Sequence, residues 1–574
     1  MNFISILVSS ALRRWRDWAF GPMLLPLPRH FGFDPACSGA VCIGRRFLQR
    51  HNRATWIPAF AGMTVEGAGK GSEMAGECAR MTGTFLSKAA GAIGLAGWLA
   101  FTSPAAHAQQ DTADRLWQGS EQQSQQLRQQ AAPGPDEEED ETVSESYRQA
   151  LEAMTQSPRT RLQRLMLEVL GAVNRRDWFG ADRSLRQYQQ VPQHDPALAV
   201  FVDASRAAAE GDLARAIEGY REVMRSNPQF VRGELDLARA LYADGRLRDA
   251  REVYAHLKGQ QVPPVIARHV DESLANIARR TRWQLNLSLA LVHEDNLNSA
   301  STVVEQCAWV LQGVCLRNNP GHEIHGTGLN FEATINKLWP LAGNHAVMLR
   351  SINYGNTYRE EGDYDNLVST TYLGYQYGSA RNQLQLLPLF EFNREYGEKI
   401  YHAFGARASF RRQLTARAQV EASYEYKVRN FSRDYQTLEG NFTGLSLFAN
   451  YAVKPDLVAY GGLYWRDNEA QQSVYSYREK VARLGVYKSF AGQATLNVAY
   501  GHRLKVAEAR NAIFGGRRQR DHENSLYVQA TFPSLQWQGL TPAVSYEHRR
   551  NNSTIPHAYN YRKNRVTLGF NKVF

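Results

Sequence analysis

Apolar and polar residues alternate almost one by one through much of the chain after residue 282. In the segment 404–411, for example, Phe and Ala residues occupy one face of an extended chain while Arg and Ser residues occupy the other, and the segment 417–429 repeats this pattern. A strand has a period of two, so each such segment has one apolar and one charged face. A soluble sandwich buries the apolar face against a second sheet, whereas a closed sheet in lipid turns it outward and keeps the charged face in water. We therefore predict a transmembrane antiparallel β-barrel over residues 282–574.

About fourteen strand candidates follow one another, an even number, as bacterial barrels of this kind require. Short connections with turn-forming residues occur at 341–344, 379–382 and 454–456, and longer ones such as 294–323 and 505–522 alternate with them. In such barrels the short turns face the periplasm and the long loops face outward. The candidates begin near Trp283, His325, Ala346, Asn366, Gln383, Tyr401, Ala416, Thr443, Leu457, Tyr475, Gln493, Asn524, Thr541 and Tyr559.

The charged face of the barrel is predicted to line its lumen. Both signs of charge occur on this face, which suits a heterogeneous polypeptide better than a single anionic polymer. An alternative is that these side chains only brace or hydrate the interior through ion pairs. The candidates for lining the lumen are Arg407, Arg411, Glu421, Glu425, Lys427 and Arg429.

The last strand candidate ends the chain on an aromatic residue. Val566, Leu568, Phe570 and Phe574 share one face, which resembles the final strand that an assembly machinery reads in outer-membrane barrels. We expect Phe570 and Phe574 to form this assembly signal. Lys572 departs from the apolar pattern, but its long side chain can reach the lipid interface.

Residues 160–281 have a helical pattern that repeats. Gly211-Asp212-Leu213 recurs as Gly245-Arg246-Leu247 at a distance of 34 residues, and Ala204, Ala216 and Tyr220 recur at the same distance. This period, with small residues where helices would cross, resembles the tetratricopeptide repeat. We predict an all-α tetratricopeptide-repeat domain before the barrel.

The resemblance to this repeat implies a groove, lined by the first helix of each unit, that binds a peptide or a protein. The apolar candidates could equally pack between helices, and the arginines could equally lie on a solvated helix face. The groove candidates are Leu198, Phe201, Arg232, Leu235, Arg239 and Tyr242.

Three segments precede the repeats. Residues 81–108 combine a lysine, an apolar stretch and an Ala-His-Ala end, the pattern of a secretory signal peptide. Residues 1–80 lack any periodicity and are interpreted as a mis-assigned upstream extension, with translation starting at Met81 or Met74. Residues 109–159 are rich in Gln and then acidic, with an unbroken acidic run at 136–141, and predict a disordered linker.

Two cysteines, Cys307 and Cys315, remain once the upstream segments are removed. An even number of cysteines in an exported chain favours a disulfide. We expect these two to be bonded within the first long loop.

Several function classes find no support in the sequence. After residue 108 no run of about 18 apolar residues occurs, which excludes a polytopic helical membrane protein. The formal net charge of +11 is spread along the chain rather than gathered in a patch, which argues against a nucleic-acid partner. Neither a nucleotide-binding loop, a nucleophile elbow nor a metal-ligand cluster is evident. We therefore expect no enzyme activity, no cofactor and no metal.

The junction between repeats and barrel carries a further resemblance. Arg282-Trp283-Gln284-Leu285 opens an alternating strand, and His293-Glu294-Asp295-Asn296-Leu297-Asn298 follows it. With the signal peptide, the repeats and the barrel, these residues resemble the surface lipoprotein assembly modulator (Slam) family over about residues 160–574. The resemblance implies an outer-membrane translocon with periplasmic repeats. Its partners would be surface lipoproteins or soluble haem- and metal-capturing proteins.

Rival interpretations remain at this point. A polysaccharide export porin also joins tetratricopeptide repeats to a barrel, usually with many more repeats, and a lumen of one charge sign would favour it. A diffusion pore and a barrel enzyme are further alternatives.

Overall fold

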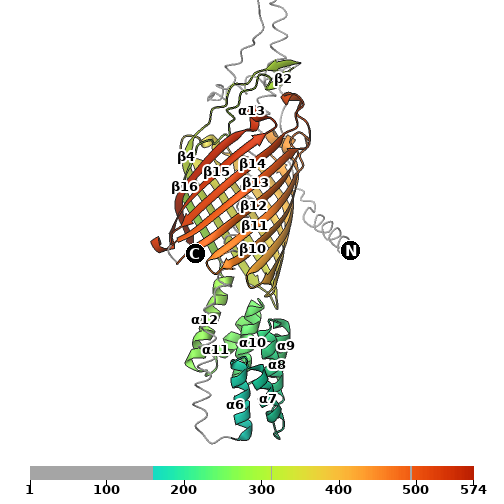
Figure 1. Ribbon diagram of the computed structural model, residues 1–574, viewed down its shortest axis with the longest axis vertical. Helices are drawn as coiled ribbons and strands as arrows, with labels where there is room; N and C mark the ends of the chain where they lie inside the picture. Colours follow the sequence, from blue (N-terminus) through green and yellow to red (C-terminus); the bar gives the residue numbers. More distant parts are fainter. Residues whose placement is uncertain (1–159, 312, 492–493) are drawn as a thin grey trace, which may run out of the picture. The chain divides into compact units, whose positions relative to one another are not determined.

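The computed structural model describes residues 160–311, 313–491 and 494–574, which form a helical module followed by a β-barrel (Figure 1). The expectations for residues 1–80, 81–108 and 109–159 lie outside the described residues. Within the described parts of the chain, no helix is both long and apolar enough to cross a membrane.

Antiparallel helices follow one another in pairs through the helical module. Polar caps begin three of them: Thr160 and Gln163 form a capping box, and the side chains of Asp177 and Asp212 each accept a backbone N–H. The helices are α6 (Arg161–Asn174), α7 (Trp178–Gln189), α8 (Ala197–Ala209), α9 (Leu213–Ser226), α10 (Val231–Ala243), α11 (Leu247–Lys258) and α12 (Pro264–Thr281).

The 34-residue period corresponds to the turns of this module. Gly211 precedes α9 and Gly245 precedes α11, and both have a φ of +79°, which glycine adopts without strain. Helices α8 and α9 cross closely, because a Cβ added at Gly219 would come within 2.8 Å of the Cβ of Ala204. Small residues thus recur where helices meet, and the predicted all-α repeat is confirmed.

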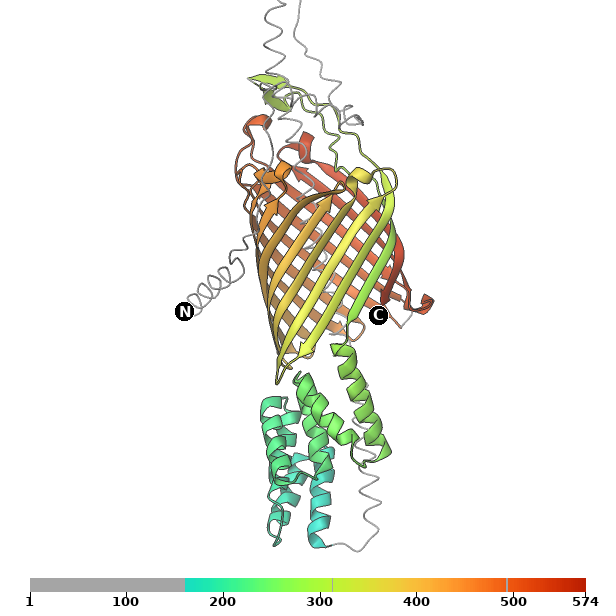
Figure 2. The same cartoon turned by 180° about the vertical axis from the view of Figure 1, so that it is seen from behind.

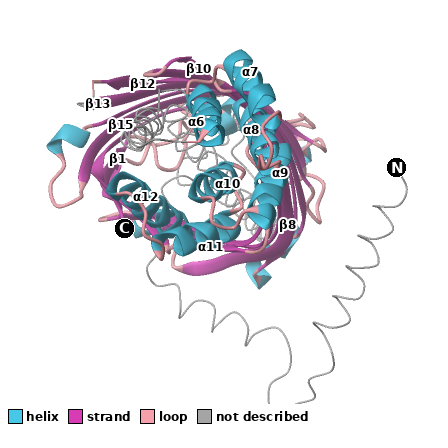
Figure 3. Ribbon diagram, turned by 90° about the horizontal axis from the view of Figure 1, so that it is seen from below, coloured by secondary structure: helices cyan, strands magenta, loops and turns pink. Residues whose placement is uncertain are grey.

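Within the described residues, fourteen antiparallel strands close into a barrel, as predicted (Figures 1 and 2). Each strand pairs with its neighbours along the chain, and β1 completes the ring by pairing with β16, so the strands encircle a lumen in the end-on view of Figure 3. The strands are β1 (Gln284–Glu294), β4 (Gly326–Pro340), β5 (His345–Tyr358), β6 (Asn366–Gly378), β7 (Asn382–Glu395), β8 (Glu398–Thr415), β9 (Ala418–Phe431), β10 (Gly440–Lys454), β11 (Leu457–Asn468), β12 (Tyr477–Phe490), β13 (Ala494–Ala507), β14 (Arg520–Thr531), β15 (Thr541–Ser553) and β16 (Tyr561–Val573).

Apolar side chains cover the outer surface of the barrel. On β1, Leu289 and Leu291 are 51% and 57% exposed, whereas Ala290 and Val292 are buried. The same alternation on β8 exposes Phe404 and Phe410 and buries Ala403 and Ser409. An apolar exterior and a polar interior are what a barrel in lipid requires.

The connections at the two ends of the barrel differ in length. At one end, called here the short-turn end, two to four residues join β4 to β5, β6 to β7, β8 to β9 and β10 to β11. At the other, the long-loop end, the connections include 295–325, 432–439, 469–476 and 508–519. The first of these loops contains the hairpin of β2 (Trp309–Leu311) and β3 (Val314–Leu316).

Two connections depart from this rule. At the long-loop end, β7 and β8 are joined by residues 396–397 alone, whose φ values of +54° and +72° allow a tight two-residue hairpin. At the short-turn end, residues 532–540 form a longer link that includes a 3-10 turn.

Candidate functional site

A buried ion pair braces four neighbouring strands inside the barrel. Lys427 on β9 donates to the two carboxylate oxygens of Glu391 on β7, at 2.8 and 2.9 Å. Glu391 also accepts hydrogen bonds from Thr370 on β6, at 3.0 Å, and from Tyr401 on β8, at 2.9 Å. Buried charge is costly unless it is paired and hydrogen-bonded, and here both conditions are met.

A second network joins β11, β12, β13 and β14 and reaches β16. Arg503 on β13 donates to Glu479 on β12 at 3.0 Å and to Glu523 on β14 at 2.9 Å. Arg466 on β11 donates to the second oxygen of Glu479 at 3.2 Å, and Tyr561 on β16 donates to Glu523. Sequence reasoning missed this network and Glu391, although these residues occupy polar positions of the same alternating pattern.

The side chains predicted to line the lumen are brought together on β8 and β9. Arg411 lies 2.9 Å from Glu421 and Arg407 lies 3.4 Å from Glu425, each opposite its partner in the strand register. Arg429 donates to the backbone carbonyl of Glu469 at 3.3 Å. These contacts brace the wall, as does the Lys427–Glu391 pair.

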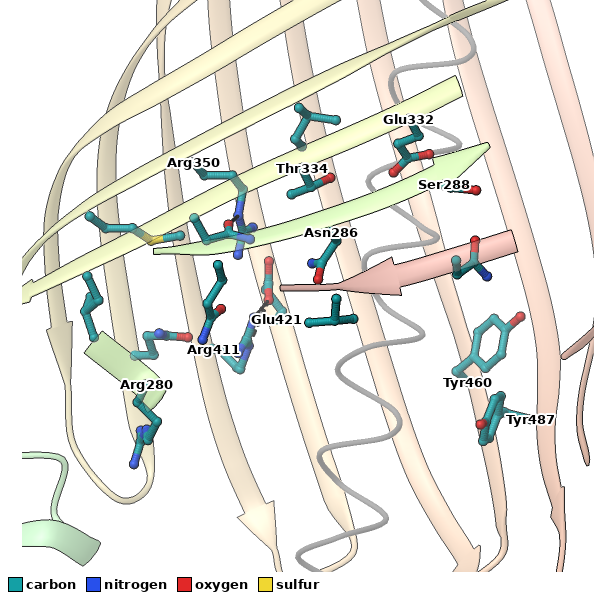
Figure 4. Close-up of a pocket in the computed structure, with 18 of the residues that line it drawn as sticks. Arg280, Asn286, Ser288, Glu332, Thr334, Arg350, Arg411, Glu421, Tyr460 and Tyr487 are labelled. Carbon is teal, nitrogen blue, oxygen red and sulfur yellow. Dashed lines mark hydrogen bonds and ion pairs between the residues drawn. The ribbon is translucent and has the colours of Figure 1, made fainter. Parts of the chain in front are cut away.

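A cavity of about 1360 Å³ lies in the lumen at the short-turn end (Figure 4). Strands from all around the ring line it, and so do residues of the helical module, among them Tyr242, Gly245 and Leu247. Figure 4 shows Arg350 and Arg411 close together beside Glu421, with Tyr460 and Tyr487 in another part of the cavity.

The charge of this cavity lining is one-sided. Among the described residues, the acidic side chains that line it are Glu332, Glu421 and Glu547. The basic ones number eleven, and we call the cavity the basic chamber for that reason. They are Arg280, Arg282, Lys337, Arg350, Arg381, Arg407, Arg411, Arg483, Arg549, Arg565 and Lys572. Arg407, Arg411 and Glu421, which were predicted from β8 and β9, line the chamber, but the excess of basic residues around the rest of the ring was not predicted from the sequence.

The predicted groove residues divide into two sets. Leu198, Phe201 and Leu235 are buried in the hydrophobic core of the helical module, the placement that packing between helices requires. The remaining three are polar or partly exposed, and each has a neighbour. Arg232 donates to Asp236 at 2.7 Å, Arg239 lies 3.3 Å from a ring nitrogen of His269, and Arg280 stacks over Tyr242 at 5.5 Å.

Hydrogen bonds link the second repeat turn to the short turns of the barrel. The side-chain amide of Asn344 donates to the backbone carbonyl of Asp244 at 2.6 Å and to its carboxylate at 3.1 Å. The backbone N–H of Ala380 donates to the same carboxylate at 3.4 Å. Gly245 approaches Gly378 so closely that a Cβ would lie 2.7 Å from the Gly378 carbonyl oxygen. The repeat glycine therefore serves the barrel contact as well as the helical turn.

The first long loop is closed by a disulfide between Cys307 and Cys315, whose Cα atoms are 4.8 Å apart. Glu305, just before it, accepts from Arg517 at 2.9 Å and from Nδ1 of His557 at 2.8 Å. The Arg517 hydrogen bond has the largest effect and lowers the pKa of Glu305; burial opposes it, and the His557 hydrogen bond lowers the pKa further, so that the pKa lies below its ordinary value. Burial lowers the pKa of His557. The loop is thereby tied to two other connections at the long-loop end.

Two residues of the junction motif, Asp295 and Asn296, form hydrogen bonds that join the end of the first strand to the last strand. The carboxylate of Asp295 accepts from the backbone N–H of Asn564 at 2.7 Å and from its side-chain amide at 2.5 Å. The side-chain amide of Asn296 donates to the carbonyl of Arg562 at 3.0 Å. Asn298 instead holds the loop to itself through His322 and Ile324.

The C-terminal residue of the chain lies beside β1 at the short-turn end, where β1 and β16 pair to close the barrel. The backbone N–H of Phe574 donates to the carbonyl of Leu285 at 2.9 Å. Phe570 and Phe574 are both exposed, and the ammonium of Lys572 lies 4.8 Å from the centre of the Phe574 ring. A cation–π contact of this kind accommodates a lysine among aromatic residues.

A metal-binding site was also sought among the side chains. Within the parts of the chain that the structure describes, no group of three or more His, Cys, Asp or Glu side chains is placed to hold a metal ion.

Two family models match this chain. Residues 283–574, more than half of the chain, match the family described as surface lipoprotein assembly modifier, and residues 151–254 match the N-terminal tetratricopeptide repeats of that family. Among solved structures, the outer membrane channel DcaP of Acinetobacter baumannii covers 51% of this chain and 97% of its own, with a TM-score of 0.30 and 8% identity.

The sequence matches to relatives of this chain cover most of the length of each relative. The hemophilin secretion modulator of Acinetobacter baumannii is 26% identical over 417 residues, 69% of this chain and 83% of that protein. Surface lipoprotein assembly modifier 2 of Haemophilus influenzae is 22% identical over 404 residues, with coverages of 67% and 80%. Surface lipoprotein assembly modifier 1 of Neisseria meningitidis is 24% identical over 396 residues, with coverages of 67% and 78%. The chain therefore belongs to the surface lipoprotein assembly modifier family, and it is an outer-membrane β-barrel with periplasmic repeats.

Proposed function

We propose that this protein exports partner proteins across the outer membrane through the lumen of its barrel, and that its periplasmic repeats receive them. The names of its relatives refer to surface lipoproteins and to hemophilin. By extension, the cargo of this chain is a surface lipoprotein or a soluble haem- or metal-capturing protein.

One observation carries the proposal beyond family membership. The basic chamber is lined both by barrel strands and by Tyr242, Gly245 and Leu247 of the repeats. A polypeptide held by the repeats would therefore already lie at the entrance of the lumen. A polar interior allows an unfolded chain to remain solvated as it passes.

The proposal assigns roles to residues on both domains. Arg239 and Tyr242 are the groove candidates best placed to meet cargo, while Leu198, Phe201 and Leu235 support them from the core. Arg407, Arg411, Glu421 and Glu425 form the wall that a translocating chain would pass. Phe570 and Phe574 would direct the barrel to its assembly machinery.

No chemical step, cofactor or nucleotide is part of this mechanism. Net movement would come from folding of the cargo outside the cell, because a folded domain is about 5–15 kcal/mol more stable than its unfolded chain. A cargo that has folded outside cannot return through the pore.

A polysaccharide exporter is the rival function, and the basic chamber would also suit an anionic polymer. The family match favours protein export, since its relatives are named for lipoprotein assembly and for secretion of a protein.

Co-expression with a candidate cargo, a surface lipoprotein or a soluble haem-capturing protein, tests the proposal. Intact cells are treated with protease, and the cargo is followed at the surface and in the medium. We expect cargo to become accessible only when this protein is present, with the heat-modifiable gel mobility of the barrel as the control for assembly. Cargo that is equally exposed in cells lacking this protein would contradict the proposal.

A further inference from the structure

The charge balance of the lumen changes along its length. Toward the long-loop end, inward-facing acids and bases occur as close pairs, at 2.8 Å for Lys427–Glu391, 2.9 Å for Arg503–Glu523 and 2.7 Å for Lys563–Glu294. Among the described residues, the basic chamber at the short-turn end has eleven Lys and Arg against three Glu, and the basic excess persists when Glu425 and Glu294, which pair with Arg407 and Arg565 from outside the lining, are added. The repeat-facing part of the lumen is therefore strongly positive, while the network farther in is balanced.

Several arginine side chains lie close to one another in the chamber, and a bound anion would reduce the electrostatic repulsion between them. Arg350 lies beside Arg411 in Figure 4, and its Nε donates to the neutral amide oxygen of Asn336 at 3.1 Å. Arg411 shares Glu421 with Arg407, at 2.9 and 3.9 Å. Like charges in a partly desolvated site repel one another, and the repulsion falls when a negative group enters.

Other basic groups of the chamber remain open to solvent. Arg280 and Arg282 at the end of the repeats and Arg381 in the β6–β7 turn are exposed. Guanidinium groups present a planar fork of N–H donors that matches a carboxylate. Because these groups come from different elements, they are spaced for several carboxylates rather than for one.

We propose that the basic chamber binds an extended acidic segment of a polypeptide. Its volume of about 1360 Å³ exceeds the roughly 300–1,000 Å³ of small-ligand pockets, and its lining spans both domains, so a polymer fits it better than a small anion. The assignment of that segment to the exported protein rests on the proposed function. An acidic segment would thus enter the barrel first and align the rest of the cargo with the lumen.

A binding measurement on the full-length protein in detergent tests the site without any need for transport. The probe is a fluorescent 20-residue peptide of Glu, Gly and Ser, and the matched probe replaces each Glu by Lys. We expect anisotropy to report saturable binding of the acidic peptide alone, and the affinity should fall as ionic strength rises. Equal binding of both peptides, or binding of neither, overturns the proposal.

Exposed residues of the chamber allow a variant whose fold should persist. The triple variant Arg280→Gln, Arg282→Gln and Arg381→Gln should bind the acidic peptide about tenfold more weakly, as expected for three partly exposed charge contacts. The control triple Arg412→Gln, Arg417→Gln and Lys454→Gln removes the same charge from exposed positions of the short-turn end outside the chamber. It should bind like the wild type, and equal losses in both triples overturn the proposal. Heat-modifiable mobility verifies that each barrel has folded.

Three further measurements identify the source of the acidic segment. If the triple variant loses peptide binding but exports cargo normally, the assignment to the cargo fails while the proposed function stands. If replacing the acidic run 136–141 by Ser raises peptide affinity about tenfold or more, the natural occupant is this chain itself, and the cargo assignment also fails. If an anionic polysaccharide such as alginate binds far more tightly than the peptide, the polypeptide assignment is overturned.

Discussion

Lys427 and Glu391 form an ion pair inside the barrel, with side chains only 3% and 1% exposed and 2.8 Å between the charged atoms. They lie on β9 and β7, so the pair spans the intervening strand β8 and acts across two ladders of backbone hydrogen bonds. Thr370 and Tyr401 satisfy Glu391 further. The carboxylate is therefore a fixed point to which four strands are attached.

Removal of one partner of this pair should destabilise the barrel strongly. We expect Lys427→Met to cost about 3–5 kcal/mol of unfolding free energy, because Glu391 would remain as a buried charge without its cation. The double variant Lys427→Met and Glu391→Met should recover most of that loss, since no unpaired charge is left. Urea unfolding in lipid vesicles, followed by heat-modifiable mobility, measures both.

A surface pair supplies the comparison for this experiment. Arg478 and Asp467 lie 3.1 Å apart, with an Arg478 side chain that is 67% exposed. Arg478→Met should change stability by less than about 1 kcal/mol. A double variant of the buried pair that is no more stable than Lys427→Met alone would show that the stabilisation comes from something other than charge neutralisation.

The junction motif should control closure of the barrel. Asp295→Ala removes the two hydrogen bonds accepted from Asn564, and we expect a cost of about 1–3 kcal/mol that falls on the β1–β16 seam. Amide exchange should become faster in β1 and β16 than in β7 and β8. Asn298→Ala is the matched control, because Asn298 bonds only within its own loop region, to His322 and Ile324. Uniform loss of protection around the ring would contradict a local role at the seam.

The strands could be predicted from sequence because their signal is local. Alternation with a period of two is visible within each segment, and it placed one strand start at Asn366 and another near His325, where β6 and β4 begin at Asn366 and Gly326. The hairpin at 396–397 gave a weaker signal, because Tyr396 is not a usual turn residue even though it adopts a positive φ.

The site depends on contacts that no local pattern contains. Lys427 and Glu391 are 36 residues apart, and only the register of three strands brings them together. The excess of basic groups in the chamber is likewise created by closure of the ring. In the repeats, core and groove positions share the same helical period, so Leu198, Phe201 and Leu235 could not be separated from groove residues before the packing was known.

Docking of the first long loop should weaken on acidification. The pKa of Glu305 is held below its usual 4.5 by Arg517, and burial lowers the pKa of His557 below its usual 6.5. Both groups bind fewer protons when the loop is docked than when it is released, so docking is fully stable above about pH 6.5. It is lost progressively as the pH falls through the two lowered pKa values.

Amide exchange of residues 301–320, corrected for the intrinsic pH dependence of exchange, measures this loss. Glu305→Gln should remove the acidic part of the transition, below about pH 4.5, and should extend the His557 part to lower pH, because the Glu305 carboxylate raises the pKa of His557 against the larger effect of burial. Protection that increases on acidification would contradict the predicted sign.

The Asp244 contact should hold the repeats to the barrel. Asp244 accepts from Asn344 through its carboxylate and its backbone carbonyl, and from the backbone of Ala380. Asp244→Ala should therefore speed amide exchange in the turns 341–344 and 379–382, at a cost of about 1–3 kcal/mol for the polar groups left without a partner. Glu210→Ala is the control, because Glu210 occupies the corresponding position of the preceding repeat, 34 residues earlier, and is exposed.

If the two domains must stay in register for cargo to pass from groove to lumen, Asp244→Ala should also lower export in the protease-shaving assay while Glu210→Ala leaves it unchanged. Normal export with both turns exchanging freely would show that the contact is dispensable for transfer.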